Sequence, residues 1–142
     1  MGSMVRWIAT TVLALLLTVS SAQAAEPNVA LDELKERCRI YAAEVFAKDY
    51  GDHLKIEGKD IYYNYQAHYN AHLNKCFFLE IAAILEKKND MALTYRLFDL
   101  FEKREYGSYT QSTQGAFFCK VQEAICRSKS KWDDLIKPYM DE

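Results

Sequence analysis

The sequence has few glycines and prolines and lacks the short motifs of common catalytic folds. Five Gly and two Pro in 142 residues, with 50% hydrophobic and 27% charged residues, exclude a collagen-like, low-complexity or disordered chain. The chain contains no Gly-x-Ser-x-Gly elbow, no Cys-x-x-Cys pair and no glycine-rich phosphate loop. We therefore find no motif for nucleophilic, redox or nucleotide chemistry and expect no cofactor.

An excess of charge of one sign is also missing. Arg6 is the only charged residue before Ala24, so the rest of the chain has 17 Lys and Arg against 20 Asp and Glu, a net charge of −3. This value is too close to neutral for a protein that binds nucleic acid or anionic membranes by bulk charge. We expect no nucleic-acid partner.

Residues 1–24 have the pattern of a secretory signal peptide. Arg6 supplies the positive start, Trp7 to Val19 is uncharged, and Ala22-Gln23-Ala24 is a small-residue cleavage site. The alternative is a retained anchor, but the strongly apolar part is about a dozen residues, whereas a spanning helix needs about 20. We predict cleavage after Ala24, which leaves residues 25–142 as one periplasmic or secreted domain without membrane insertion.

Four cysteines follow the leader, and an even number in a small exported chain predicts two disulfides. They are Cys38, Cys76, Cys119 and Cys126, and the sequence leaves all three pairings open. Free thiols or a zinc site are the alternatives, which an oxidising compartment disfavours.

Two segments have the three- and four-residue apolar spacing of amphipathic helices. The first is Leu31 to Tyr50, with Asn28 as a possible cap and Gly51 as its end. The second starts at Ser130, where Asp133 completes an approximate capping box. Its apolar stripe contains Trp132, Leu135, Ile136 and Tyr139, and Pro138 limits its length.

The residues between the two helices favour strands. After a polar, turn-like stretch from Gly51 to Asp60, the segment Ile61 to Tyr69 alternates with a period of two and contains many tyrosines. A turn is expected at Asn70 to Asn74. The apolar run Lys75 to Leu85 fits either a strand or a buried helix, and we favour a strand because the preceding strand needs a close partner.

Further short strands are predicted in Met91 to Glu102, Tyr106 to Thr110 and Phe117 to Val121, with Thr110 to Gly115 as a mobile loop. The expected fold is therefore α+β, an antiparallel sheet of four to five short strands packed by N- and C-terminal helices.

The strongest candidate for a metal site is His68-x3-His72-x3-Cys76. On a continuous helix these side chains would share one face, and imidazole and thiolate are good zinc ligands. The alternation from Tyr62 to Tyr69 instead predicts a strand, which directs the three groups apart. We therefore predict no metal site.

Tyrosine is unusually common, with four of the ten between Tyr62 and Tyr69. Exposed aromatic side chains on a sheet can bind sugars, peptides or proteins, whereas rings can also pack across strands. We favour packing for the group and expect Tyr62, Asn64 and Gln66 to face solvent.

The segment from His68 to Phe77 (His-Tyr-Asn-Ala-His-Leu-Asn-Lys-Cys-Phe) resembles one found in small exported bacterial proteins of unknown function. The similarity extends to Leu97-Phe98-Asp99, a turn with Glu102 and Tyr106, two later cysteines, the Trp132 helix and Pro138-Tyr139-Met140. The resemblance implies no activity. It does imply that His72 stands at a variable position, and that His68, Asn70, Asn74 and Cys76 are the first positions to test.

The favoured hypothesis is a non-catalytic domain that binds an unknown protein or envelope component through a tyrosine-rich sheet face. Its candidate binding residues are Tyr62, Asn64, Gln66, His68, Asn70 and Asn74. One alternative is a small metal-dependent enzyme or hydrolase that uses His68, His72 and Asp99. Another is a structural subunit of an envelope assembly.

Overall fold

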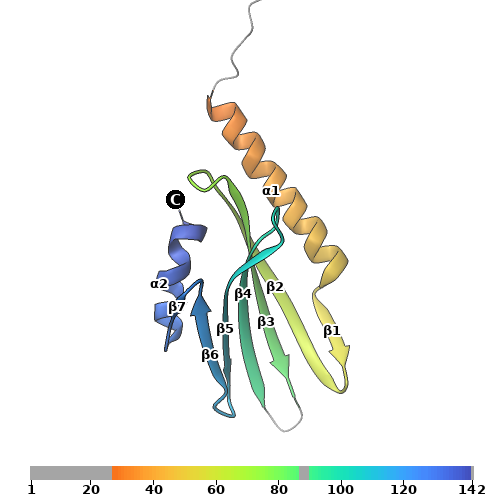
Figure 1. Ribbon diagram of the computed structural model, residues 1–142. Helices are drawn as coiled ribbons and strands as arrows, with labels where there is room; N and C mark the ends of the chain where they lie inside the picture. Colours follow the sequence, from red (N-terminus) through yellow and green to blue (C-terminus); the bar gives the residue numbers. More distant parts are fainter. Residues whose placement is uncertain (1–26, 87–89, 142) are drawn as a thin grey trace, which may run out of the picture.

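The structure is a computed structural model that describes residues 27–86 and 90–141. Within these residues, seven strands form one antiparallel sheet in which each strand pairs with the next along the chain (Figure 1). One helix precedes the first strand and another follows the last strand. The elements are α1 (Pro27–Asp49), β1 (His53–Ile56), β2 (Lys59–Asn70), β3 (Lys75–Leu85), β4 (Met91–Asp99), β5 (Arg104–Ser112), β6 (Phe117–Val121), β7 (Ala124–Ile125) and α2 (Lys129–Met140). The predicted α+β fold is confirmed.

The two helices pack on opposite faces of the sheet. Successive residues of a strand point to opposite faces. In β3, Cys76 and Phe78 belong to the core under α1, whereas Phe77 and Leu79 belong to the core under α2 with Trp132. The sheet therefore separates two small apolar cores, each closed by one helix.

Coverage of both faces explains the ambiguous sequence of β3. Residues Cys76 to Glu80 are all buried, and the first four of them, Cys76 to Leu79, form a continuous apolar run with no polar alternation. The prediction of a strand at Lys75 to Leu85 is confirmed.

The sheet has more strands than the four or five predicted from the sequence. The polar stretch from Gly51 to Asp60 is a hairpin, in which β1 and β2 join at Glu57 and Gly58 with φ of 51° and 79°. Positive φ at both positions is typical of the tight turns that connect paired strands. All four β1 residues are exposed, which removes the alternation that would have indicated a strand. The other additional strand, β7, has only two residues.

The prediction of a mobile loop at Thr110 to Gly115 is also wrong for the first half of this segment. Thr110 to Ser112 belong to β5, and the Ser112 N–H donates to the Ala116 carbonyl at 2.9 Å, which starts a tight hairpin. The polar residues that suggested a loop pair with β4 through their backbone.

Both helix starts differ from the predicted caps. Asn28 lies inside α1, and Ser128 rather than Ser130 caps α2, because its extended backbone (φ −156°) lets its Oγ accept the Lys131 N–H at 3.1 Å. The end of α1 is as predicted, since Gly51 has φ of 70° and its N–H donates to the Phe46 carbonyl.

Two disulfides are present, as the cysteine count predicted. Cys38 of α1 bonds to Cys76 of β3, and Cys119 bonds to Cys126 across the β6–β7 hairpin. Such bonds are typical of an oxidising compartment outside the cytoplasm. No helix in residues 27–86 and 90–141 is long and apolar enough to cross a membrane. The predicted signal peptide lies outside the described residues.

Candidate functional site

The six candidate binding residues divide between an exposed and a covered group. All lie on or next to β2, and Tyr62, Asn64 and Gln66 are exposed on the same face of the sheet as α2. His68 and Asn70 continue along that face but lie where α2 covers it.

The covered residues connect elements of the fold. Asn70 is buried, donates through Nδ2 to the Pro138 carbonyl at 3.0 Å, and accepts the Leu73 N–H at 2.9 Å. In the turn that follows, Asn74 has φ of 52° and accepts the Tyr69 hydroxyl at 2.5 Å. These contacts give Asn70 and Asn74 a role in shaping the β2–β3 hairpin and attaching α2 to it.

The tyrosines of β2 divide in the same way. Tyr65 stacks on Phe78 at 5.2 Å, Tyr63 contacts Tyr50 at 5.4 Å, and Tyr69 is buried. These three rings pack on the α1 side, as cross-strand and helix packing would predict. Tyr62 alone among them is on the α2 side and exposed, where it lies 4.7 Å from the His53 ring.

The strand register shows which residues surround Tyr62 and Asn64. One row across the sheet runs from His53 of β1 through Tyr62, Ala83, Leu93 and Gln111 to Phe117, and the next row runs from Asn64 to Ile81 and then under α2. We call the seven residues of these rows from β2 to β6 the open face; they are Tyr62, Asn64, Ile81, Ala83, Leu93, Gln111 and Phe117. The sequence could not identify the five from β3 to β6, because their proximity depends on the pairing register.

The open face contains no charged residue. Its two outermost rings, Tyr62 and Phe117, are 48% and 45% exposed. The row beyond it starts at Asp60, whose carboxylate is bound by His53 Nε2 at 3.0 Å. The face is thus an uncharged surface with a charged boundary.

A groove of about 380 Å³ borders the open face, between α2 and the sheet. Gln66 and Ile81 line its sheet side, and Asp133 and Lys137 line its helix side. Lys129 lies 4.5 Å above the Tyr95 ring and also binds Asp133 at 2.5 Å. Gln66, predicted to face a partner, therefore lies where the groove meets the open face.

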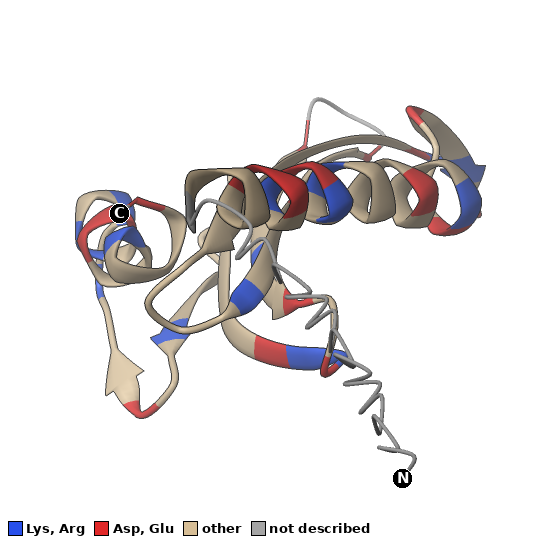
Figure 2. Ribbon diagram, turned by 90° about the horizontal axis from the view of Figure 1, so that it is seen from above, with Lys and Arg blue, Asp and Glu red and all other residues tan. Residues whose placement is uncertain are grey.

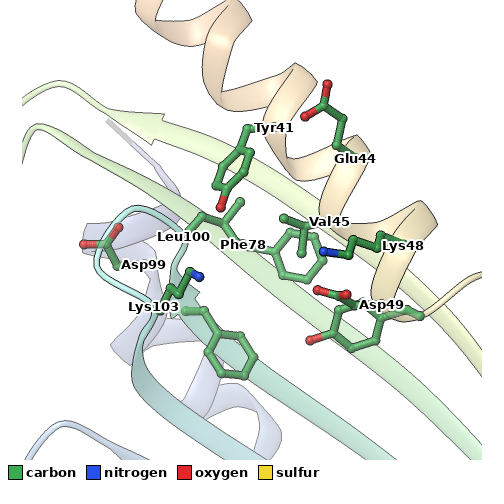
Figure 3. Close-up of a pocket in the computed structure, with 11 residues that line it drawn as sticks. Tyr41, Glu44, Val45, Lys48, Asp49, Phe78, Asp99, Leu100 and Lys103 are labelled. Carbon is green, nitrogen blue, oxygen red and sulfur yellow. The ribbon is translucent and has the colours of Figure 1, made fainter.

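A larger cavity of about 470 Å³ lies on the other side of the sheet, between α1 and the β4–β5 turn (Figure 3). Its apolar wall contains Tyr41, Val45, Phe78, Phe98 and Leu100. We call it the α1 cavity. No local pattern in the sequence indicates this cavity, because it is formed by segments about 50 residues apart.

Tyr50 lines this cavity and interacts with Glu80, and both side chains have a raised pKa. Burial, together with the nearby Glu80 carboxylate, raises the pKa of Tyr50 to about 12, so its phenol stays neutral. Burial also raises the pKa of Glu80, and the charge of Arg96 opposes this effect. The Glu80 Oε2 lies 3.5 Å from Arg96 Nη1 and has no hydrogen-bond donor among the described residues.

The candidate metal and catalytic residues do not come together. Cys76 is oxidised and faces α1, His68 faces the opposite side of the sheet, and His72 is exposed in the turn. Asp99 is separated from His68 by Phe77 of the intervening strand, and its carboxylate is bound by Lys75. In the part of the chain that the structure describes, no three His, Cys, Asp or Glu side chains are placed to hold a metal ion.

Comparison with protein-family models, curated proteins and solved structures finds no match to this chain.

Proposed function

We propose that this chain is an exported, non-catalytic domain that binds a protein or other envelope component through the open face. The uncharged character of that face carries the proposal. Protein interfaces are depleted of charge at their centre and enriched in aromatic residues. Tyr62 and Phe117 supply exposed rings at its two ends. Asn64 and Gln111 supply amide NH2 groups that can donate, while their oxygens accept the Tyr65 N–H and the Tyr109 hydroxyl.

The neighbouring groove supports the same site. A flat face gives little shape specificity, whereas a helix along its border provides a depression into which a partner side chain can insert. Gln66, Lys129 and Asp133 at the groove offer polar groups at the rim of the interface.

Export to the periplasm or the medium is part of the proposal. The two disulfides support it, as does the signal-peptide pattern of residues 1–24. The resemblance of the His68–Phe77 segment to small exported bacterial proteins points in the same direction.

Capture experiments with matched variants test the proposal. Asn64→Arg places a charge on the open face next to Tyr62, and Asn28→Arg makes the same change on the exposed surface of α1. Tagged protein from the producing cells should lose its envelope partners with Asn64→Arg and retain them with Asn28→Arg. Circular dichroism should show that both variants are folded. Equal capture by the two variants would exclude the open face as the binding surface.

A further inference from the structure

The α1 cavity has an apolar wall, and two lysines are among the charged residues that line it. Val45 of α1, Phe78 of β3 and Leu100, the residue after β4, surround its interior. Its volume of about 470 Å³ lies in the range of small-molecule sites, about 300–1,000 Å³, and such sites are mostly apolar with a few polar groups.

Two lysines enter the cavity from different elements. Figure 3 shows Lys48 of α1 and Lys103 of the β4–β5 turn with their ammonium groups directed toward the space between these elements. Neither ammonium group has a carboxylate within ion-pair distance among the described residues. Acidic and basic residues both occur along α1 (Figure 2). Glu44 and Asp49 are among the residues that line the cavity, and the carboxylate of Glu44 points away from its interior (Figure 3).

The position of Lys103 is fixed by buried groups. Asp99 is fully buried, and its Oδ1 accepts the N–H of Phe101 at 3.0 Å, which shapes the turn. Its carboxylate points away from the cavity (Figure 3) and is bound by Lys75, so it does not neutralise Lys103. Lys103 itself has φ of 52°, a left-handed conformation that favours glycine.

From this arrangement we infer that the α1 cavity binds a small amphipathic carboxylate, such as a medium-chain fatty acid. The alkyl chain would lie against Val45, Phe78 and Leu100, and the carboxylate would be held by Lys48 and Lys103. A polyanion fits poorly because most of the wall is apolar, and a cationic amphiphile would meet two ammonium groups and one carboxylate.

Three probes of equal chain length test the ligand class. Decanoate, decanol and decyltrimethylammonium differ in head-group charge, and each is titrated below its micelle-forming concentration into the oxidised protein by calorimetry and ¹H–¹⁵N NMR. We expect saturable binding of decanoate, with amide shifts in α1 and the β4–β5 turn, at least tenfold tighter than for the other two probes. Absence of decanoate binding, equal affinity for decyltrimethylammonium, or shifts confined to the open face would overturn the inference.

Single-residue variants distinguish loss of the binding site from loss of the fold. Lys48→Gln and Lys103→Gly should each weaken decanoate binding at least fivefold, and Lys131→Gln on α2 should leave it unchanged. Lys103→Gly relieves the left-handed strain, so its melting temperature should not fall and lost binding cannot be attributed to unfolding. Asn64→Arg on the open face should retain decanoate binding, which makes this test independent of the proposed function. Unchanged affinity in Lys48→Gln and Lys103→Gly would exclude the two lysines as the carboxylate site.

Discussion

Lys75 and Asp99 form an ion pair that connects the start of β3 to the end of β4. The Lys75 Nζ lies 2.7 Å from the Asp99 Oδ2, and the Asp99 side chain is completely buried. Lys75 also binds Glu102 at 2.5 Å, and these carboxylates raise the pKa of Lys75, so the ammonium stays charged. This pair stabilises the turn that forms one side of the α1 cavity.

Removing the cation from this pair should destabilise the folded protein. Lys75→Met leaves the Asp99 carboxylate buried without a counter-charge, and we expect the free energy of unfolding to fall by about 2–4 kcal/mol in urea denaturation. The double variant Lys75→Met with Asp99→Asn should recover part of this loss, because the amide oxygen can still accept the turn N–H groups. A loss below about 0.5 kcal/mol in Lys75→Met would contradict a structural role for the pair.

The two disulfides should differ in their effect on stability. Cys38 and Cys76 are 38 residues apart, whereas Cys119 and Cys126 are 7 apart. Loop-closure entropy then predicts losses of about 4 kcal/mol for Cys38→Ala with Cys76→Ala and about 2 kcal/mol for the other pair. Urea denaturation of both double variants and of the oxidised parent protein measures these losses in the free energy of unfolding. A larger loss for the pair that closes the short loop would contradict the entropic account.

Gly107 is required by the packing of α2. A Cβ at this position would lie 2.9 Å from the Lys120 carbonyl oxygen and 3.1 Å from the Trp132 ring. Gly107→Ala should therefore lower the free energy of unfolding by about 1–3 kcal/mol. It should also shift the fluorescence of Trp132, the only tryptophan after the predicted cleavage site. Unchanged stability and emission would show that α2 does not pack as closely as described.

The raised pKa of Glu80 predicts a pH dependence with a definite sign. Between the ordinary value of 4.5 and the raised value, the native state binds more protons than the unfolded state, so stability falls as the pH rises. Glu80→Gln lacks this penalty, and its stability relative to the parent protein should increase from pH 4.5 to pH 7. Thermal melts across this range measure it.

Glu105 provides the matched control for that variant. It contacts the same guanidinium, with its Oε2 3.0 Å from Arg96 Nη2, but is exposed. Glu105→Gln should show no gain in relative stability with pH. The same gain in both variants would mean that burial of Glu80 is not its cause.

The sequence predicted two kinds of element. In one kind, a buried face gives a periodic hydrophobic pattern, and in the other, a local conformational requirement selects a particular residue. The period of two in Ile61 to Tyr69 indicated β2, and Gly51 marked the end of α1, because its positive φ is a local requirement. The hairpin at β1 was missed because a strand exposed on both sides has no hydrophobic alternation.

The candidate site was predictable only in part. Alternation identified Tyr62 and Asn64 as exposed, and the structure places them so. Leu93, Gln111 and Phe117 join them through the register of five strands, and Lys48 and Lys103 line one cavity because α1 packs on the sheet. Such long-range contacts leave no signal in local spacing. In the same way, Asn70 and Pro138 meet although 68 residues separate them.

Photo-crosslinking tests the role of the open face most directly. The photoreactive residue p-benzoylphenylalanine replaces Asn64 on the open face, or Asn28 on the exposed surface of α1, in protein exported by the cells that produce it. We predict a discrete adduct with a partner when position 64 is irradiated and none at position 28. Adducts of equal yield at both positions, or an adduct at position 28 alone, would contradict binding through the open face.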